Sequence, residues 1–122
     1  MFSKAKNEVA SLKSRKKIDI LFNEGRRFKK ERVQLVCSTT NEEVLALGFG
    51  VSKKLFPKAV DRNKIKRLMR EQFKLIRQEN TYAVFFGNGF FIYSGKEMPI
   101  LDSFEQPMKE LIKQWCSLVK AS

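Results

Sequence analysis

Hydrophobic residues occupy every second position in two segments near the middle of the chain. Val33, Leu35 and Cys37 alternate with more polar neighbours, and a second alternation runs from Leu45 to Ser52. A period of two predicts a pair of β-strands. The second segment has large side chains on one face and small ones on the other: Leu45, Leu47, Phe49 and Val51 against Ala46, Gly48, Gly50 and Ser52. The small face predicts either a closely packed helix or a ligand. Polar residues 41–43 between the segments predict a turn.

Three other segments have helical periodicity. The first is predicted to begin after a cap at Ser14 and to end at Gly25. The second is long and strongly basic and runs to about Glu79. The third opens with Ser103 and Gln106, a pair typical of a capping box, and tolerates Pro107 in its first turn. Its apolar stripe predicts a core-facing helix and consists of Phe104, Met108, Leu111, Ile112, Trp115 and Leu118.

The aromatic stretch 82–93 is interrupted by Gly87-Asn88-Gly89. It predicts either a hairpin turning at these residues or one principal strand, Phe90–Ser94, and we favour the single strand. Phe90 and Phe91 are interpreted as sheet core rather than as an exposed binding surface. The order is then α-β-β-α-β-α, which predicts one α+β domain with a small mixed sheet packed by a long helix. Residues 1–13 are expected to form a basic arm, and residues 14–122 the domain.

Charge is distributed very unevenly along the chain. The net charge is +12, and residues 1–78 carry +13 whereas residues 79–122 carry −1. Such asymmetry points to a polyanionic partner, with nucleic acid favoured over an anionic membrane. No apolar run is long enough to span a bilayer, and no signal peptide is recognised, so a cytoplasmic protein is expected.

The residue types present exclude several kinds of chemistry. Histidine is absent, which removes His-based triads and most zinc sites. Cys37 and Cys116 lack metal-ligand spacing and are expected to be reduced thiols. Gly48-Phe49-Gly50 falls inside a predicted strand and lacks a third glycine, so it does not predict a dinucleotide loop. No catalytic or metal-binding residue is predicted.

The long basic helix is predicted to have two distinct faces. Arg62, Lys66 and Arg70 recur at intervals of four, with Asn63 and Arg67 beside them. A fixed array of guanidinium and ammonium groups is suited to binding phosphates. The adjacent face is apolar and consists of Ile65, Leu68, Met69, Phe73 and Ile76.

Three segments together resemble the bacterial ribonuclease P protein family. One is Leu12–Gly25, with its closing glycine, and another is the Val51-Ser52-Lys53-Lys54 stretch after a strand. The third is a helix of the A-V-x-R-N-R-x-K-R-x-x-R-E type, here Ala59-Val60-Asp61-Arg62-Asn63-Lys64-Ile65-Lys66-Arg67-Leu68-Met69-Arg70-Glu71.

The resemblance implies a ribosomal protein S5 domain 2-like fold with a left-handed strand–helix–strand crossover. It implies a non-catalytic protein subunit of an endoribonuclease that removes the 5′ leader of precursor tRNA. The chemistry would belong to a catalytic RNA, with Mg2+ held mainly by that RNA, and no membrane, DNA or protein oligomer would be required. The family's leader-binding cleft would include Ile18 and Phe22. Contacts to the catalytic RNA would come from Lys53, Lys54, Arg62, Asn63, Lys64, Lys66, Arg67 and Arg70.

Two positions depart from the family pattern. Lys64 replaces an arginine and keeps the charge without the bidentate fork of a guanidinium. Ile18 stands where an aromatic residue is common, so a stacked base worth about 1–3 kcal/mol is not available there. The alternative function is a ribosomal or general structured-RNA-binding protein with no role in tRNA processing. A DNA-binding regulator is less well supported, because a strand rather than a short partner helix precedes the basic helix.

Overall fold

The structure is a computed structural model that describes residues 9–39, 44–79 and 87–121. Within these ranges the elements are β1 (Val9–Ser11), α2 (Arg15–Glu24), β2 (Arg26–Lys30), β3 (Val33–Ser38), β4 (Leu45–Val51), α3 (Ala59–Glu79), β5 (Gly87–Tyr93), the 3-10 turn η1 (Leu101–Phe104) and α4 (Glu105–Ala121). The turn predicted for residues 41–43 and the start of the aromatic stretch, residues 82–86, lie outside the described residues.

The strands form one mixed sheet in the order β1-β4-β5-β3-β2. β4 is parallel to both β1 and β5, whereas β3 is antiparallel to β5 and to β2. Helix α3 connects the parallel neighbours β4 and β5, as expected for a strand–helix–strand unit. The prediction of a small α+β domain is therefore confirmed. The left-handed sense of the crossover stays a prediction.

The two edge strands were not predicted from the sequence. β2 has four cationic residues in five positions and is mostly exposed, so it has no hydrophobic alternation to reveal it. Cationic side chains on an edge strand also discourage pairing with another sheet. β1 lies in the segment interpreted as an arm, yet Val9–Ser11 pair with Leu45–Leu47, and Leu12 is buried. Residues 9–12 therefore belong to the folded domain.

Helix α2 has the boundaries that the sequence predicts. The Ser14 side chain accepts a hydrogen bond from the backbone N–H of Lys17 at 3.3 Å and caps the helix. At the other end, the Gly25 N–H donates to the Leu21 carbonyl at 2.7 Å. A Cβ at position 25 would lie 2.5 Å from that carbonyl oxygen, so close approach rather than backbone conformation requires glycine here.

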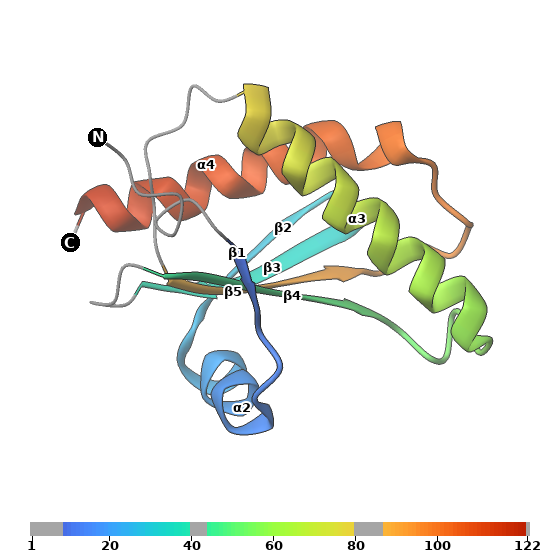
Figure 1. Ribbon diagram of the computed structural model, residues 1–122, viewed down its shortest axis with the longest axis horizontal. Coiled ribbons are helices and arrows are strands. Elements are labelled where there is room, and N and C mark those ends of the chain that lie inside the picture. Colours follow the sequence, from blue (N-terminus) through green and yellow to red (C-terminus); the bar gives the residue numbers. More distant parts are fainter. Residues whose placement is uncertain (1–8, 40–43, 80–86, 122) are drawn as a thin grey trace.

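Helices cover the two faces of the sheet unequally (Figure 1): α3 and α4 lie on one face and α2 on the other. The α3/α4 face holds the main core, in which Ile65, Met69, Phe73 and Ile76 are almost fully buried. The apolar face predicted for α3 is thus confirmed, although Leu68 is only partly buried at its margin. Under α2 a smaller cluster forms from Leu12, Leu21, Val36 and Ala46.

Helix α4 completes the main core but begins differently from the prediction. The Ser103 hydroxyl lies within η1 and accepts a hydrogen bond from the Ile100 N–H at 3.3 Å, so Ser103 does not cap α4. The predicted capping box is therefore wrong, because a 3-10 turn precedes the helix. Trp115 is fully buried as predicted, and its ring lies against β5 at Gly89, where a Cβ would overlap it.

Residues 87–89 lie inside β5 rather than in a turn. Asn88 and Gly89 pair with both β4 and β3, and Gly87 pairs with β4. The hairpin alternative for a turn at these residues is therefore wrong, and the single strand is confirmed with an earlier start. Glycine suits the first of these positions because Gly87 has φ 141° and a Cβ there would overlap the Ser38 carbonyl.

Candidate nucleic-acid interface

Helix α3 presents a cationic face next to its buried face. Asn63, Lys64, Arg67 and Arg70 are exposed, and Lys66 is partly buried. These residues occupy successive turns of one helix whose opposite side is anchored in the core. Together with Arg62 near its start, α3 therefore carries six of the eight predicted RNA-binding residues on one continuous element.

Arg62 has a structural role at the start of this helix. Its Nη1 donates hydrogen bonds to the backbone carbonyls of Phe56 at 2.8 Å and Pro57 at 2.7 Å. Because Phe56 is buried in the main core, these bonds fix the approach of the preceding loop to α3. The remaining N–H groups of the half-buried guanidinium are left for other contacts.

Lys53 and Lys54 lie in the turn between β4 and α3, and both are exposed. The Ser52 hydroxyl accepts a hydrogen bond from the Lys54 N–H at 3.2 Å, and the Ser52 carbonyl accepts one from the Phe56 N–H at 3.0 Å. The small polar residue before the two lysines therefore shapes the turn that carries them. Both cations precede the N-terminal end of α3.

Arg70 is held in place by an aromatic ring of the sheet. Its guanidinium lies 5.3 Å from the centre of the Phe49 ring, and that ring stacks on Phe91 at 5.9 Å. A guanidinium over an aromatic face is attracted by the ring and keeps its N–H edge available. Arg70 is thus held in one orientation by the protein itself.

The second predicted site lies on the opposite face of the sheet, under α2. Ile18 and Phe22 are both partly buried and pack against the smaller cluster. The Phe22 ring meets the Phe90 ring edge to face, with centroids 5.3 Å apart. Arg27 also contacts Phe22. Its guanidinium lies 5.4 Å from the centre of the Phe22 ring and donates a hydrogen bond to the Phe22 carbonyl at 2.8 Å. The sheet face beside α2 therefore combines two rings and a cation.

Further polar residues extend this site across the sheet. The strand register places Lys29, Gln34, Ile92 and Gly50 in one cross-strand row, next to the row that contains Arg27 and Phe90. None of the side chains in this Lys29–Gly50 row is buried. We call these two rows together with Ile18 and Phe22 the α2 groove. Sequence reasoning missed its β2 members because that strand was not predicted.

Phe90 is also placed differently from its sequence interpretation. It is only partly buried and lies on the α2 side, whereas Phe91 is fully buried in the main core. The core interpretation is correct for Phe91 and incomplete for Phe90. The two glycines of β4, Gly48 and Gly50, were the sequence signal that a large side chain such as Phe90 lies on this face of the sheet.

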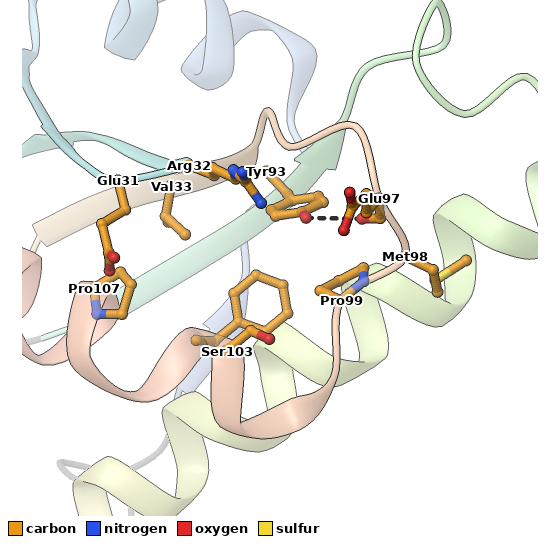
Figure 2. Close-up of a pocket in the computed structure, with 10 residues that line it drawn as sticks. Glu31, Arg32, Val33, Tyr93, Glu97, Met98, Pro99, Ser103 and Pro107 are labelled. Atoms are coloured by element: carbon orange, nitrogen blue, oxygen red, sulfur yellow. Dashed lines mark hydrogen bonds between the residues drawn. The ribbon is translucent and has the colours of Figure 1, made fainter.

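The largest cavity among those described lies elsewhere, beside the start of α4 (Figure 2). It has a volume of about 610 Å3 and is bordered by Glu31, Arg32, Tyr93 and Glu97. The Tyr93 hydroxyl donates to the Glu97 carbonyl at 2.8 Å. Burial raises the pKa of Tyr93, and the nearby Arg32 opposes this shift. Two carboxylates beside one arginine make this cavity a poor site for a polyanion.

The described residues offer little for catalysis by side chains. No group of three carboxylates or cysteines that could hold a metal ion occurs among them. Burial raises the pKa of the Cys37 thiol to about 12, although Arg26 opposes the shift, so this thiol stays protonated at neutral pH. No helix in the described part of the chain is long and apolar enough to cross a membrane. The site is suited to binding.

Comparisons with known proteins agree with this geometry. The family model for ribonuclease P matches residues 7–118. The chain is 33% identical to the ribonuclease P protein component of Chlorobaculum tepidum, over 92% of this chain and 82% of that protein. It is 28% identical to the component from Nitrosococcus oceani, over 82% of this chain and 79% of that protein.

The chain belongs to the ribonuclease P protein family. It is the protein component of a tRNA-processing endoribonuclease that contains an RNA subunit. The fold agrees with the ribonuclease P protein of Thermotoga maritima, with a TM-score of 0.71, 24% identity, and coverage of 85% of this chain and 96% of that one. For the Staphylococcus aureus protein the TM-score is 0.70 at 22% identity, covering 88% and 95%.

Proposed function

We propose that this protein docks on the catalytic RNA through α3 and holds the 5′ leader of precursor tRNA in the α2 groove. The observation that carries the proposal is the cationic face of α3. Lys64, Arg67 and Arg70 are exposed on this face, and the apolar face of the same helix packs in the core. Lys53, Lys54, Arg62, Asn63 and Lys66 are proposed to extend this contact. A rigid array loses little side-chain freedom for each phosphate that it binds.

The α2 groove has the chemistry expected of a single-strand binding site. Phe22 and Phe90 supply aromatic surface, and Arg27 and Lys29 supply charge along one edge. Stacking on rings together with cations that follow the backbone binds single strands with little sequence preference. A leader differs in sequence from one precursor to the next, so this kind of recognition fits the substrate.

The protein's contribution to cleavage is electrostatic and positional. Its positive charge offsets repulsion between two polyanions, the catalytic RNA and the precursor tRNA. Holding the leader in the α2 groove lengthens the contact past the cleavage site, so the substrate is oriented before the chemical step. Mg2+ held by the RNA would supply the hydrolytic chemistry. The proposal places this activity in the cytoplasm and requires no protein oligomer.

Reconstitution with the cognate RNA tests the proposal. The protein should lower the Mg2+ concentration needed to cleave a precursor tRNA, and cleavage that is unchanged by the protein would contradict it. Phe22→Leu should weaken binding of a precursor that has a leader, but not binding of mature tRNA. A general structured-RNA-binding protein would bind both RNAs equally and would not stimulate cleavage. Lys113→Ala, an exposed charge removed from α4, is the matched control.

A further inference from the structure

A cavity opens at the edge of the sheet where β1 ends and β4 continues. The two strands pair only from Val9–Leu45 to Ser11–Leu47, and the Leu12 N–H then donates to the Leu47 carbonyl at 2.8 Å. β4 runs on to Val51. Within the described residues no strand pairs with this side of β4 beyond Leu47, so its backbone edge is accessible from the cavity.

The cavity has a volume of about 420 Å3, which lies within the range of small-molecule sites, roughly 300–1,000 Å3. Among the residues that the structure describes, every ionisable side chain that lines the cavity is cationic, namely Lys13, Lys66, Arg70 and Lys74. By contrast, the cavity of Figure 2 includes Glu31 and Glu97, and the cavity between α2 and β1 includes Glu24. An anion is therefore the ligand that its charge favours.

Three aromatic side chains also line the cavity. Phe49 and Phe73 reach it from the α3 side of the sheet. Phe90 belongs to the other face, but it borders the cavity because β4 has glycine where a side chain would block the ring. A Cβ at Gly48 would lie 2.5 Å from the Phe90 ring. Aromatic surface beside the cations favours a ligand with an apolar, flat part as well as a negative charge.

We propose that this cavity binds one unpaired nucleotide. The base would lie against the aromatic wall, with its polar edge towards the free backbone of β4, and the phosphate would lie among Lys66, Arg70 and Lys74. Ring surface and cations are the combination that binds single nucleotides. The proposal deepens the RNA-binding role above and rests on it for the source of the nucleotide. That source is either an unpaired residue of the RNA partner or a free nucleotide.

Titration of the isotope-labelled full-length protein, followed by NMR, tests the proposal without the RNA. Adenosine and uridine monophosphates should shift the amide signals of Ser11, Leu47 and Gly48 and reach saturation. They should bind about tenfold more tightly than ribose 5-phosphate, because only they carry a base. Equal affinity for ribose 5-phosphate and inorganic phosphate would show an anion site only and would overturn the proposal.

Two variants tie the binding to this cavity. Ser11 pairs with Leu47 and therefore points towards the α3 side, so Ser11→Trp should fill the space and abolish nucleotide binding. Lys74→Ala, at an exposed position, should weaken nucleotide binding several-fold, while Lys113→Ala should not. Thermal melts establish that each variant is folded. If both variants are folded and both bind nucleotides as tightly as the wild type, the nucleotide does not bind in this cavity.

Measuring how tightly the same variants bind the catalytic RNA shows whether the nucleotide in the cavity is part of that RNA or a free nucleotide. If the nucleotide belongs to the RNA, Ser11→Trp should weaken RNA binding more than Lys113→Ala does. If RNA affinity is unchanged while mononucleotide binding is lost, the ligand is a free nucleotide. Failure of the protein to stimulate cleavage would count against the proposed function alone, because the mononucleotide titration needs neither RNA nor substrate.

Discussion

Substitutions at two nearby positions on α3 should have separate effects, one on the stability of the fold and the other on RNA binding. Met69 is 0% exposed and packs in the main core, whereas Arg67 is exposed. Met69→Ala removes most of a fully buried side chain, and such truncations cost about 2–5 kcal/mol of the free energy of unfolding because the cavity closes only in part. That is a large share of a typical total of about 5–15 kcal/mol. For a chain of this length, each kcal/mol lowers the melting temperature by about 3–5 °C.

Arg67→Ala should have the opposite profile. Exposed substitutions change stability by about 0.5 kcal/mol or less. If Arg67 neutralises one phosphate, its removal should lower the slope of log K against log salt by about 0.7–0.9. The linear dependence of log K on log salt also gives the change in affinity. At 0.1 M salt, losing the contact to one phosphate should weaken binding of the catalytic RNA by roughly five- to eightfold.

Circular-dichroism melts and RNA binding over a salt series measure the two effects. Lys113→Ala removes one exposed charge from α4 and should leave both the melting temperature and the salt slope near the wild-type values. The assignment of faces on α3 is refuted if Met69→Ala melts like the wild type. It is refuted equally if Arg67→Ala keeps the full salt slope while Lys113→Ala reduces it.

Three other outcomes are expected. Arg62→Ala should lose about 1–3 kcal/mol of stability through its two hydrogen bonds to backbone carbonyls, and a melting temperature equal to that of Arg67→Ala would contradict this. Gly89→Ala should destabilise the domain because its Cβ would overlap the Trp115 ring, and a smaller loss of stability from Gly89→Ala in a Trp115→Leu background than in the wild type would identify that overlap as the cause. Stability should fall as pH rises from 9.0 to about 12, since the unfolded Cys37 thiol loses its proton there while the folded one keeps it. Chemical denaturation in alkaline buffers should show a shallower fall for Cys37→Ala, and equal slopes would argue against this cause.

The sequence predicted those elements that carry a strong local signal. Ser14 and Gly25 marked the ends of α2 because capping depends on a few adjacent residues. The apolar face of α3 followed from helical spacing, and four of its five predicted members are almost fully buried. Such features depend on residues close together in the chain, which is why one sequence was enough.

The edge strands depended on partners far away in the chain. β2 consists of Arg26–Lys30, and it is a strand because it pairs with β3, not because its own side chains alternate in polarity. β1 likewise exists only through pairing with β4. The α2 groove was therefore only partly predictable: Ile18 and Phe22 came from the family resemblance, whereas Arg27 and Lys29 required knowledge of the sheet.

The glycines of β4 show how one local feature serves both proposed sites. The small face of this strand predicted a close helix or a ligand, but a ring from the neighbouring strand occupies the space, with Phe90 lying against Gly48 and Gly50. On one side that ring meets Phe22 in the α2 groove, and on the other it borders the cavity beside β1. Any larger residue at position 48 would have to displace Phe90 and so alter both surfaces at once. We therefore expect binding of the leader and of the single nucleotide to respond together to changes at Gly48, although the two sites lie on opposite sides of the sheet.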